Sequence, residues 1–151
     1  SFVLARRVAG QAGIFALAQL VILLVWSRAG MMLSAFFPVD ANDTAMLFEY
    51  LAVGSAIGTV FAALTFATAA VSLPMIADRD VDMITACISS ITAVLRNKPA
   101  MLLWAVLLAA LTAVGFATAF VGLVVIMPWL AYATWYAYRE TLQPGDWPML
   151  D

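Results

Sequence analysis

Long uncharged stretches separated by short polar intervals form the main pattern along this chain. The longest runs from Ala100 to Tyr138 without one Lys, Arg, Asp or Glu, and two shorter ones cover Val8–Ser27 and Tyr50–Ala77. A helix that crosses a bilayer needs roughly 20 predominantly apolar residues. Each of the three runs is long enough, so the pattern predicts a protein that is integral to a membrane.

The first two runs predict spans at about 8–30 and 50–77. At about 1.5 Å per residue, the third run as one straight helix would be almost twice as long as the hydrocarbon core, which is roughly 30 Å thick. We therefore expect this run to fold back between Gly115 and Gly122, which gives two spans at about 100–115 and 120–138.

The polar interval between the second and third spans has a helical periodicity. Its large apolar residues recur at steps of three and four: Val81, Ile84, Ile88, Ile91 and Leu95. This spacing predicts an amphipathic helix over about 79–97 that lies in the membrane interface.

Charged residues at both ends of this interval fit the dipole of such a helix. Acidic residues open the interval and basic residues close it, in the order Asp78, Asp80, Asp82, Arg96 and Lys98. Because Asp78 and Asp82 are four residues apart, they could instead share a hard cation on one helix face. We favour the capping role, since no further carboxylates cluster nearby in the sequence to complete a metal site.

These elements predict an all-α integral membrane protein with four transmembrane helices and a cytoplasmic interfacial helix between spans two and three. We expect a single domain over residues 1–151. Since the chain begins at Ser1 without an initiator methionine, we also expect it to be the C-terminal part of a longer membrane protein.

The distribution of charge predicts the orientation of the spans. Six basic residues fall on one side under this topology, namely Arg6, Arg7, Arg79, Arg96, Lys98 and Arg139, and the loop on the other side holds Asp40, Asp43 and Glu49. Cytoplasmic loops carry an excess of Lys and Arg. We therefore expect both ends of the chain on the cytoplasmic side of a bacterial inner membrane.

Arg28 is the one basic residue in the sequence that this distribution does not place on the cytoplasmic side. It closes the first uncharged run, and its long side chain can extend to the membrane surface. The alternative is a buried Arg28 paired with an acidic residue, for which Asp40, Asp43 and Glu49 are the nearest candidates in sequence.

Two further groups of residues stand out within the spans. Gly54, Gly58 and Ala62 are spaced by four and predict a helix-packing face of small side chains. Aromatic residues gather near the end of the last span, at Trp129, Tyr132, Trp135, Tyr136 and Tyr138. We interpret them as an aromatic belt at the headgroup level, with a stacking surface for a quinone or pigment ring as the alternative.

Composition limits the chemistry. Hydrophobic residues make up 66% of the chain, only seven residues are Lys or Arg, and the net charge is −2, which argues against a nucleic-acid partner. The sequence contains no histidine and one cysteine, Cys87. We expect no catalytic site, no cofactor and no metal, because histidine is the commonest haem and zinc ligand and no nucleophile has an apparent base.

Three segments carry a family resemblance: Trp26–Phe37, Val71–Asp82 and Ala131–Arg139. Together they resemble a bacterial family of predicted integral membrane proteins, the domain of unknown function number twenty-one eighty-nine. Some members of that family carry a provisional cytochrome c oxidase label, and many have histidines where this chain has Tyr132 and Tyr136. Tyrosines cannot supply two imidazoles to a haem, so an oxidase activity does not carry over.

We therefore expect a non-catalytic accessory or assembly subunit that packs against a larger bacterial inner-membrane complex, with a respiratory complex suggested by the family label. Its partners would be membrane lipids and other transmembrane subunits. The alternative is part of a small-molecule or ion transporter, which would need polar groups along a path through the membrane. A cavity shared by Arg28, Thr59, Thr65, Thr68 and Thr112 would favour that alternative.

Overall fold

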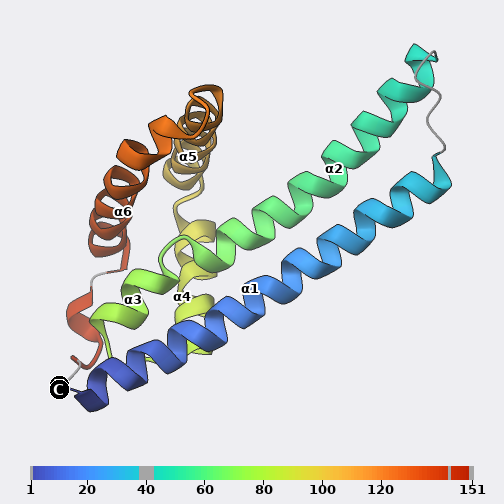
Figure 1. The fold of residues 1–151 in the computed structure, drawn as a ribbon. Coiled ribbons are helices and arrows are strands. Elements are labelled where there is room, and N and C mark those ends of the chain that lie inside the picture. The colour runs from blue at the N-terminus through green and yellow to red at the C-terminus, as the bar shows by residue number, and fades with distance from the viewer. Residues whose placement is uncertain (1, 38–42, 143, 150–151) are drawn as a thin grey trace. The chain divides into compact units, whose positions relative to one another are not determined.

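The computed structural model describes residues 2–37, 43–142 and 144–149, and within these ranges the regular structure is helical (Figure 1). The helices are α1 (Phe2–Phe36), α2 (Thr44–Ala69), α3 (Ser72–Asp78), α4 (Met83–Arg96), α5 (Lys98–Ala117), α6 (Val121–Leu142) and the 3-10 turn η1 (Pro144–Asp146).

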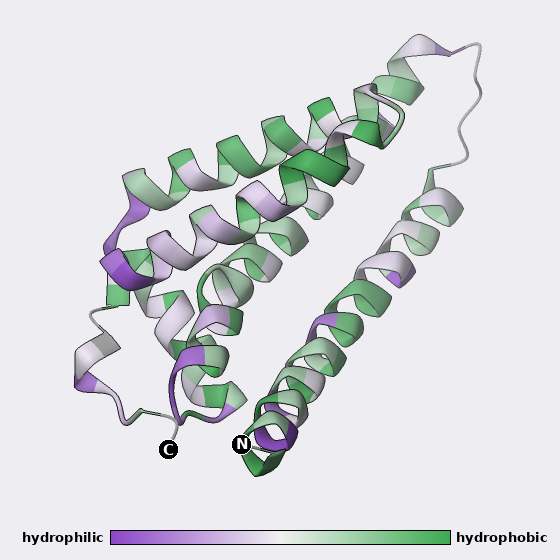
Figure 2. Cartoon of the chain, turned by 60° about the vertical axis from the view of Figure 1, so that its left-hand side comes forward, coloured by the Kyte–Doolittle hydropathy of each residue, from purple (hydrophilic) through white to green (hydrophobic). Residues whose placement is uncertain are grey.

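Four stretches are long and apolar enough to cross a membrane: α1, α2 together with α3, α5 and α6. Figure 2 shows hydrophobic residues along the visible length of these helices. The shorter apolar helix α4 lies between the second and third of them. The predicted all-helical fold with four candidate spans and one additional helix is therefore confirmed.

The contacts divide the chain into two compact units. One consists of residues up to Ala12 and from Phe66 onward, and the other of Gly13–Thr65. The second unit is the hairpin formed by most of α1 and α2. Helix α1 is longer than the predicted span at 8–30. It begins at Phe2, and its helical backbone continues through Arg28 as far as Phe36.

The predicted span at 50–77 is interrupted at Ala70 and Val71, where α2 ends and α3 begins. Pro74 explains the interruption. A proline lacks the N–H that would bond to the carbonyl four residues earlier, here that of Ala70, and its ring clashes with this carbonyl. The long apolar run therefore forms two helices instead of one.

Helix α4 supplies hydrogen bonds at this interruption. The Val71 N–H donates to Ser90 Oγ at 3.3 Å. The Ser72 hydroxyl donates to the carbonyl of Thr68 and also lies 3.2 Å from the carbonyl of Ala86. Ser72 and Ser90 are completely buried, so these bonds satisfy polar groups that water cannot reach.

Helix α3 forms the centre of the larger unit, where it packs against α4 and α6. Its residues Met75 and Ile76 are buried together with Val71. The inward face of α4 consists of small residues, Ala86, Ser90 and Ala93, and α6 contributes Tyr138. Small side chains on α4 therefore allow it to lie close to α3.

Helices α5 and α6 form a tight hairpin whose turn falls between Gly115 and Gly122, where the sequence predicts it. A Cβ atom on Gly115 would overlap Leu123 Cδ2, so α6 approaches α5 where α5 has no side chain. The Thr118 hydroxyl accepts the Gly122 N–H at 2.9 Å and closes the turn.

Candidate functional site

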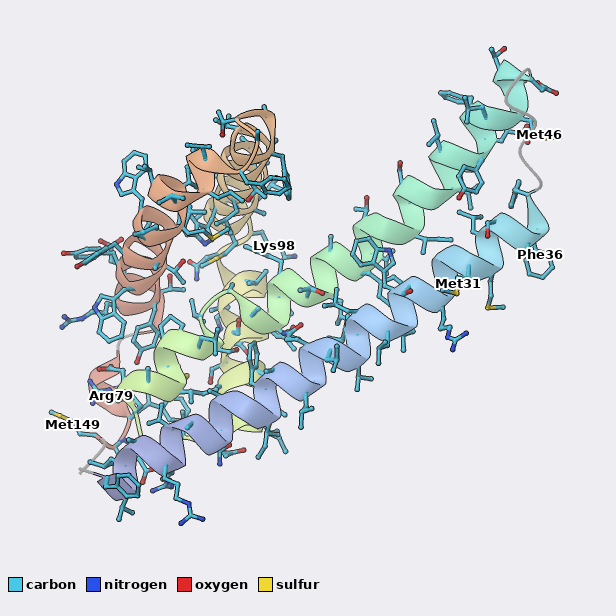
Figure 3. The ribbon with its side chains drawn as sticks, in the orientation of Figure 1. Met31, Phe36, Met46, Arg79, Lys98 and Met149 are labelled. Atoms are coloured by element: carbon cyan, nitrogen blue, oxygen red, sulfur yellow. The ribbon has the colours of Figure 1, made fainter. Side chains whose placement is uncertain are left out.

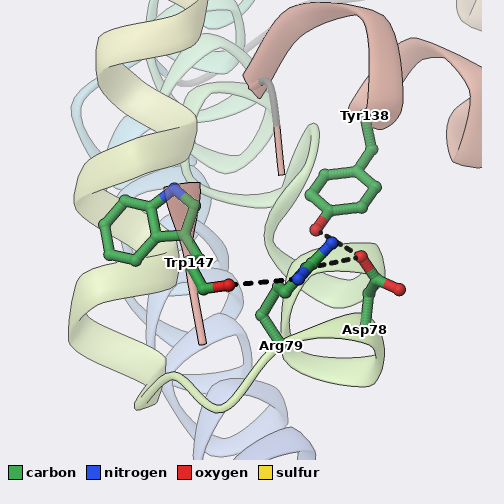
Figure 4. Close-up of polar contacts among 4 residues, drawn as sticks. All are labelled: Asp78, Arg79, Tyr138 and Trp147. Atoms are coloured by element: carbon green, nitrogen blue, oxygen red, sulfur yellow. Dashed lines mark hydrogen bonds and ion pairs between the residues drawn. The ribbon is translucent and has the colours of Figure 1, made fainter. Parts of the chain in front are cut away.

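Polar residues from distant parts of the sequence meet at the connection between α3 and α4. We call Arg7, Asp78, Arg79, Asp80 and Tyr138 the polar cluster. Asp78 Oδ2 accepts hydrogen bonds from the Tyr138 hydroxyl at 2.9 Å and from Arg79 Nε at 3.1 Å (Figure 4). Tyr138 is fully buried, so its ring belongs to the core and its hydroxyl bonds to the charged carboxylate.

The same connection holds the C-terminal segment Trp147–Met149. Arg79 Nη1 donates to the carbonyl of Trp147 at 3.0 Å (Figure 4). The Asp80 N–H donates to the carbonyl of Pro148 at 3.1 Å. An isolated antiparallel bridge joins Arg79 to Met149. Arg79 thus bonds to α3 and to the end of the chain at once.

The beginning of α1 binds to the other side of this connection. Arg7 forms an ion pair with Asp80 at 2.5 Å. Gln11 Oε1 accepts the N–H of Met83, the first residue of α4, at 2.9 Å. The polar cluster and its neighbours therefore join four segments: the start of α1, the α3–α4 connection, the end of α6 and the C-terminal segment.

Asp82 forms the N-cap of α4, one of the roles that the sequence suggests for the acidic residues. Its Oδ2 accepts the N–H groups of Ile84 and Thr85, and its Oδ1 accepts the Thr85 hydroxyl at 2.6 Å. The hydrogen bond from the Thr85 side chain is the main reason why the pKa of Asp82 is lowered from its ordinary value, and the backbone bonds add to it.

Asp78 and Asp80 lie before α4 instead of in its first turn. Asp78 is the last residue of α3, and the extended backbone of Arg79 separates it from the α4 N-cap, Asp82. The predicted helix at 79–97 is accordingly shorter, Met83–Arg96, and Asp78 and Asp82 do not share a helix face. Among the described residues, no group of three or more His, Cys, Asp or Glu side chains is arranged to hold a metal ion.

The two basic residues predicted at the end of the interfacial helix lie at the junction of α4 and α5. Arg96 is the last residue of α4, and Lys98 is the first residue of α5. Arg96 lines a polar hollow between the ends of α4 and α6, together with Thr92, Asn97, Thr141 and Asp146. Because Arg96 and Asp146 carry opposite charges, this hollow favours neither an anionic nor a cationic ligand.

The small-residue face of α2 contacts α1 at two of its three positions. A Cβ on Gly54 would lie 3.2 Å from Leu33 Cδ2, and one on Gly58 would lie 3.8 Å from Trp26 Cζ2. Ala62 is exposed. Side chains of α1 therefore occupy the space that the two glycines leave.

Arg28 is exposed on α1, and it forms no ion pair with any residue within 2–37, 43–142 or 144–149. Of its three candidate partners, Asp40 lies outside the described residues. Asp43 instead accepts the N–H groups of Ala45 and Met46 and so caps the start of α2.

The aromatic residues of α6 divide between two sides of the helix. Trp129, Tyr132 and Tyr136 are exposed, and Trp129 and Tyr132 line a shallow apolar hollow beside Val125 and Pro128. Trp135 is half-buried, with its ring 5.7 Å from that of Tyr138. The exposed rings fit an aromatic belt, whereas Tyr138 belongs to the polar cluster.

Sequence reasoning missed Gln11 and Trp147 as partners in the site and assigned Tyr138 to the aromatic belt, whereas its hydroxyl bonds to Asp78. It also missed the buried hydrogen bonds of Ser72 and Ser90. The available signal was the segment Val71–Asp82, one of the three segments that carry the family resemblance. Its charged residues bond to other parts of the same chain, so the arrangement can position four segments.

Comparison with known proteins identifies a family over the first half of the chain, which leaves Arg79–Asp82 and Ala131–Arg139 outside the match. The model of a family described as predicted integral membrane protein (DUF2189) matches residues 1–78, which is more than half of the 151 residues. No curated protein and no solved structure shows a significant match. The match includes α1, α2, α3 and thus Asp78 of the polar cluster. The chain belongs to the DUF2189 family of predicted integral membrane proteins.

Proposed function

We propose that this chain is a non-catalytic accessory or assembly subunit that packs against a larger complex of the bacterial inner membrane. The observation that supports this role is the exposure of the α1–α2 hairpin. Phe15 and Leu33 are the buried residues of α1, and none of residues 44–69, all of which the structure describes, is buried. Met31, Phe36 and Met46 extend away from the helices (Figure 3).

Glycines on α1 support a protein partner in addition to lipid. A Cβ on Gly10, Gly13 or Gly30 would meet nothing within 4 Å. Glycine weakens a helix, by roughly 1 kcal/mol relative to alanine, and a surface that faces only lipid gains nothing from it. Small residues do let a second helix approach closely. The open glycines therefore support contact with a helix from another chain.

The proposal places both chain ends on the cytoplasmic side. It is supported by the polar cluster, which brings the start of α1, the α3–α4 connection and the C-terminal segment to one end of their unit, with Arg6, Arg7 and Arg79 among them. The positive-inside rule assigns such an end to the cytoplasm. A respiratory complex is favoured only by the label that some family members carry.

The test is co-migration from native membranes. We expect the tagged full-length protein, extracted in mild detergent, to migrate on a native gel with a constant set of subunits identified by mass spectrometry. The variant Gly10→Leu/Gly13→Leu should lose these subunits. Because both positions face open space, the larger side chains leave the fold of the chain intact. Ile14→Leu, an exposed position on the same helix, is the matched control and should keep the subunits.

Migration of the wild-type protein alone would contradict the proposal. The transporter alternative makes a different prediction, because substrate flux in proteoliposomes should then disappear in Arg28→Ala. Thr59, one of the residues proposed to line a path, is exposed and donates its hydroxyl to the carbonyl of Ser55 in its own helix. Neither Arg28 nor Thr59 lines the hollows on α6 or at the α4–α6 ends.

A further inference from the structure

Helix α4 has three distinct faces. The inward face consists of Ala86, Ser90 and Ala93. A stripe of large apolar side chains faces outward, and we call it the α4 stripe: Ile84, Ile88, Ile91 and Leu95. Ile84, Ile88 and Leu95 are 63%, 59% and 60% exposed. Between these two faces lies a polar flank of Thr85, Ser89, Thr92 and Arg96.

The position of α4 restricts what can cover this stripe. Asn97 alone separates the end of α4 from α5, a candidate membrane span. The end of α4 must therefore lie at the level where a span begins. A helix with one apolar stripe and one polar flank at this level fits the boundary between lipid headgroups and acyl chains.

Basic charge lies beside the stripe at the same end. Arg96 and Lys98 are exposed, and neither forms an ion pair with a residue in the described part of the chain. Arg96 shares its hollow with Asp146 without an ion pair between them. Guanidinium and ammonium groups bind phosphate oxygens by charge-assisted hydrogen bonds. The surface of an anionic bilayer attracts basic residues in this position.

We propose that α4 lies on the bilayer surface as a site for anionic phospholipids, with the α4 stripe among the acyl chains and Arg96 and Lys98 on lipid phosphates. The inference is independent of the proposed subunit role, which concerns α1 and α2. It predicts that anionic lipids gather at α4 in preference to zwitterionic lipids, by up to about thirtyfold at low salt for two basic residues, and less at high salt.

The experiment measures lipid contact at α4 directly. The full chain with Cys87→Ala and Ile88→Cys carries a fluorophore at position 88 in nanodiscs of phosphatidylcholine and phosphatidylglycerol. We expect quenching by spin-labelled phosphatidylglycerol to exceed that by spin-labelled phosphatidylcholine, and the preference to disappear in Arg96→Gln/Lys98→Gln. Arg6→Gln/Arg28→Gln removes the same charge elsewhere and should preserve the preference.

A fluorophore at Ser89→Cys, on the polar flank, separates the two parts of the proposal. Aqueous iodide should quench this label more strongly than the label at position 88, and lipid quenchers should quench it less. Quenching at position 88 mainly by iodide would show that the stripe does not face acyl chains. Equal quenching by the two spin-labelled lipids in the wild-type background would exclude the anionic site.

Discussion

Ala119 and Phe120, in the turn between α5 and α6, have positive φ angles of 50° and 69°. This backbone conformation costs residues other than glycine about 1–2 kcal/mol. We therefore expect Ala119→Gly to raise the stability of the protein by about 1 kcal/mol, seen as a higher unfolding temperature in detergent.

The matched control for this prediction is Ala113→Gly, in the interior of α5. The same substitution there should lower stability by about 1 kcal/mol, because glycine is a poor helix former. A shift in the same direction for both variants would contradict the assignment of strain to the turn.

Asp82 connects the stability of α4 to pH. Its pKa is lowered in the folded protein, mainly by the Thr85 side chain. A lowered folded-state pKa stabilises the fold above the unfolded-state pKa, and this stabilisation is lost as the pH falls through the folded-state value. The loss should therefore appear below about pH 4, where aspartate titrates.

Asp82→Asn tests this prediction, because asparagine caps a helix as well as aspartate but does not titrate. Between pH 7 and pH 3, the unfolding temperature of the wild-type protein should fall further than that of Asp82→Asn. Parallel curves for the two proteins would argue against a role of this carboxylate.

At the scale of helices, the α5–α6 hairpin depends on the absence of a side chain at Gly115. A Cβ there would lie 2.8 Å from Leu123 Cγ, so Leu123 would have to move. Gly115→Ala should destabilise the hairpin by about 1–3 kcal/mol through overpacking. Leu123→Ala, introduced second, should recover part of that loss, and additive effects in this double-mutant cycle would contradict the contact.

The attachment of the C-terminal segment to the α3–α4 connection depends on Arg79, whose side chain is largely buried and bonds to the Trp147 carbonyl. A hydrogen bond from a charged group contributes about 1.5–3 kcal/mol. Arg79→Ala should therefore speed deuterium exchange of a peptide containing Trp147–Met149 by roughly tenfold or more. Arg139→Ala, which removes an exposed charge from α6, should leave that exchange unchanged.

For the whole molecule, we predict opposite sides of the membrane for the α1–α2 connection and the chain ends. Single cysteines replace Thr44 and Gly145, both exposed, in a Cys87→Ala background. Burial raises the pKa of the Cys87 thiol and so slows its reaction with maleimide. Replacing Cys87 by alanine removes this background reaction altogether. An impermeant maleimide should label position 44 in intact cells and position 145 only after permeabilisation. Labelling of both positions from one side would overturn this topology.

Local sequence patterns predict the number of long apolar helices and their approximate positions. Lipid offers no hydrogen bonds, so a spanning segment must satisfy its own backbone as a helix of fixed minimum length. The run Ala100–Tyr138 is too long for one such helix, and its turn could therefore be placed between Gly115 and Gly122. The interruption before α3 was also readable in principle, because Pro74 acts on its own neighbours.

Only the tertiary structure shows how these helices pack against one another. The polar cluster pairs Arg7 with Asp80 and Asp78 with Tyr138, residues far apart in sequence that no local pattern connects. The tertiary structure also shows that α4 packs through Ala86, Ser90 and Ala93, while its stripe of large apolar residues faces outward. Periodicity shows that a helix has an apolar face, but in a membrane protein both the core and the lipid are apolar. Only the packing of neighbouring helices determines which face is buried.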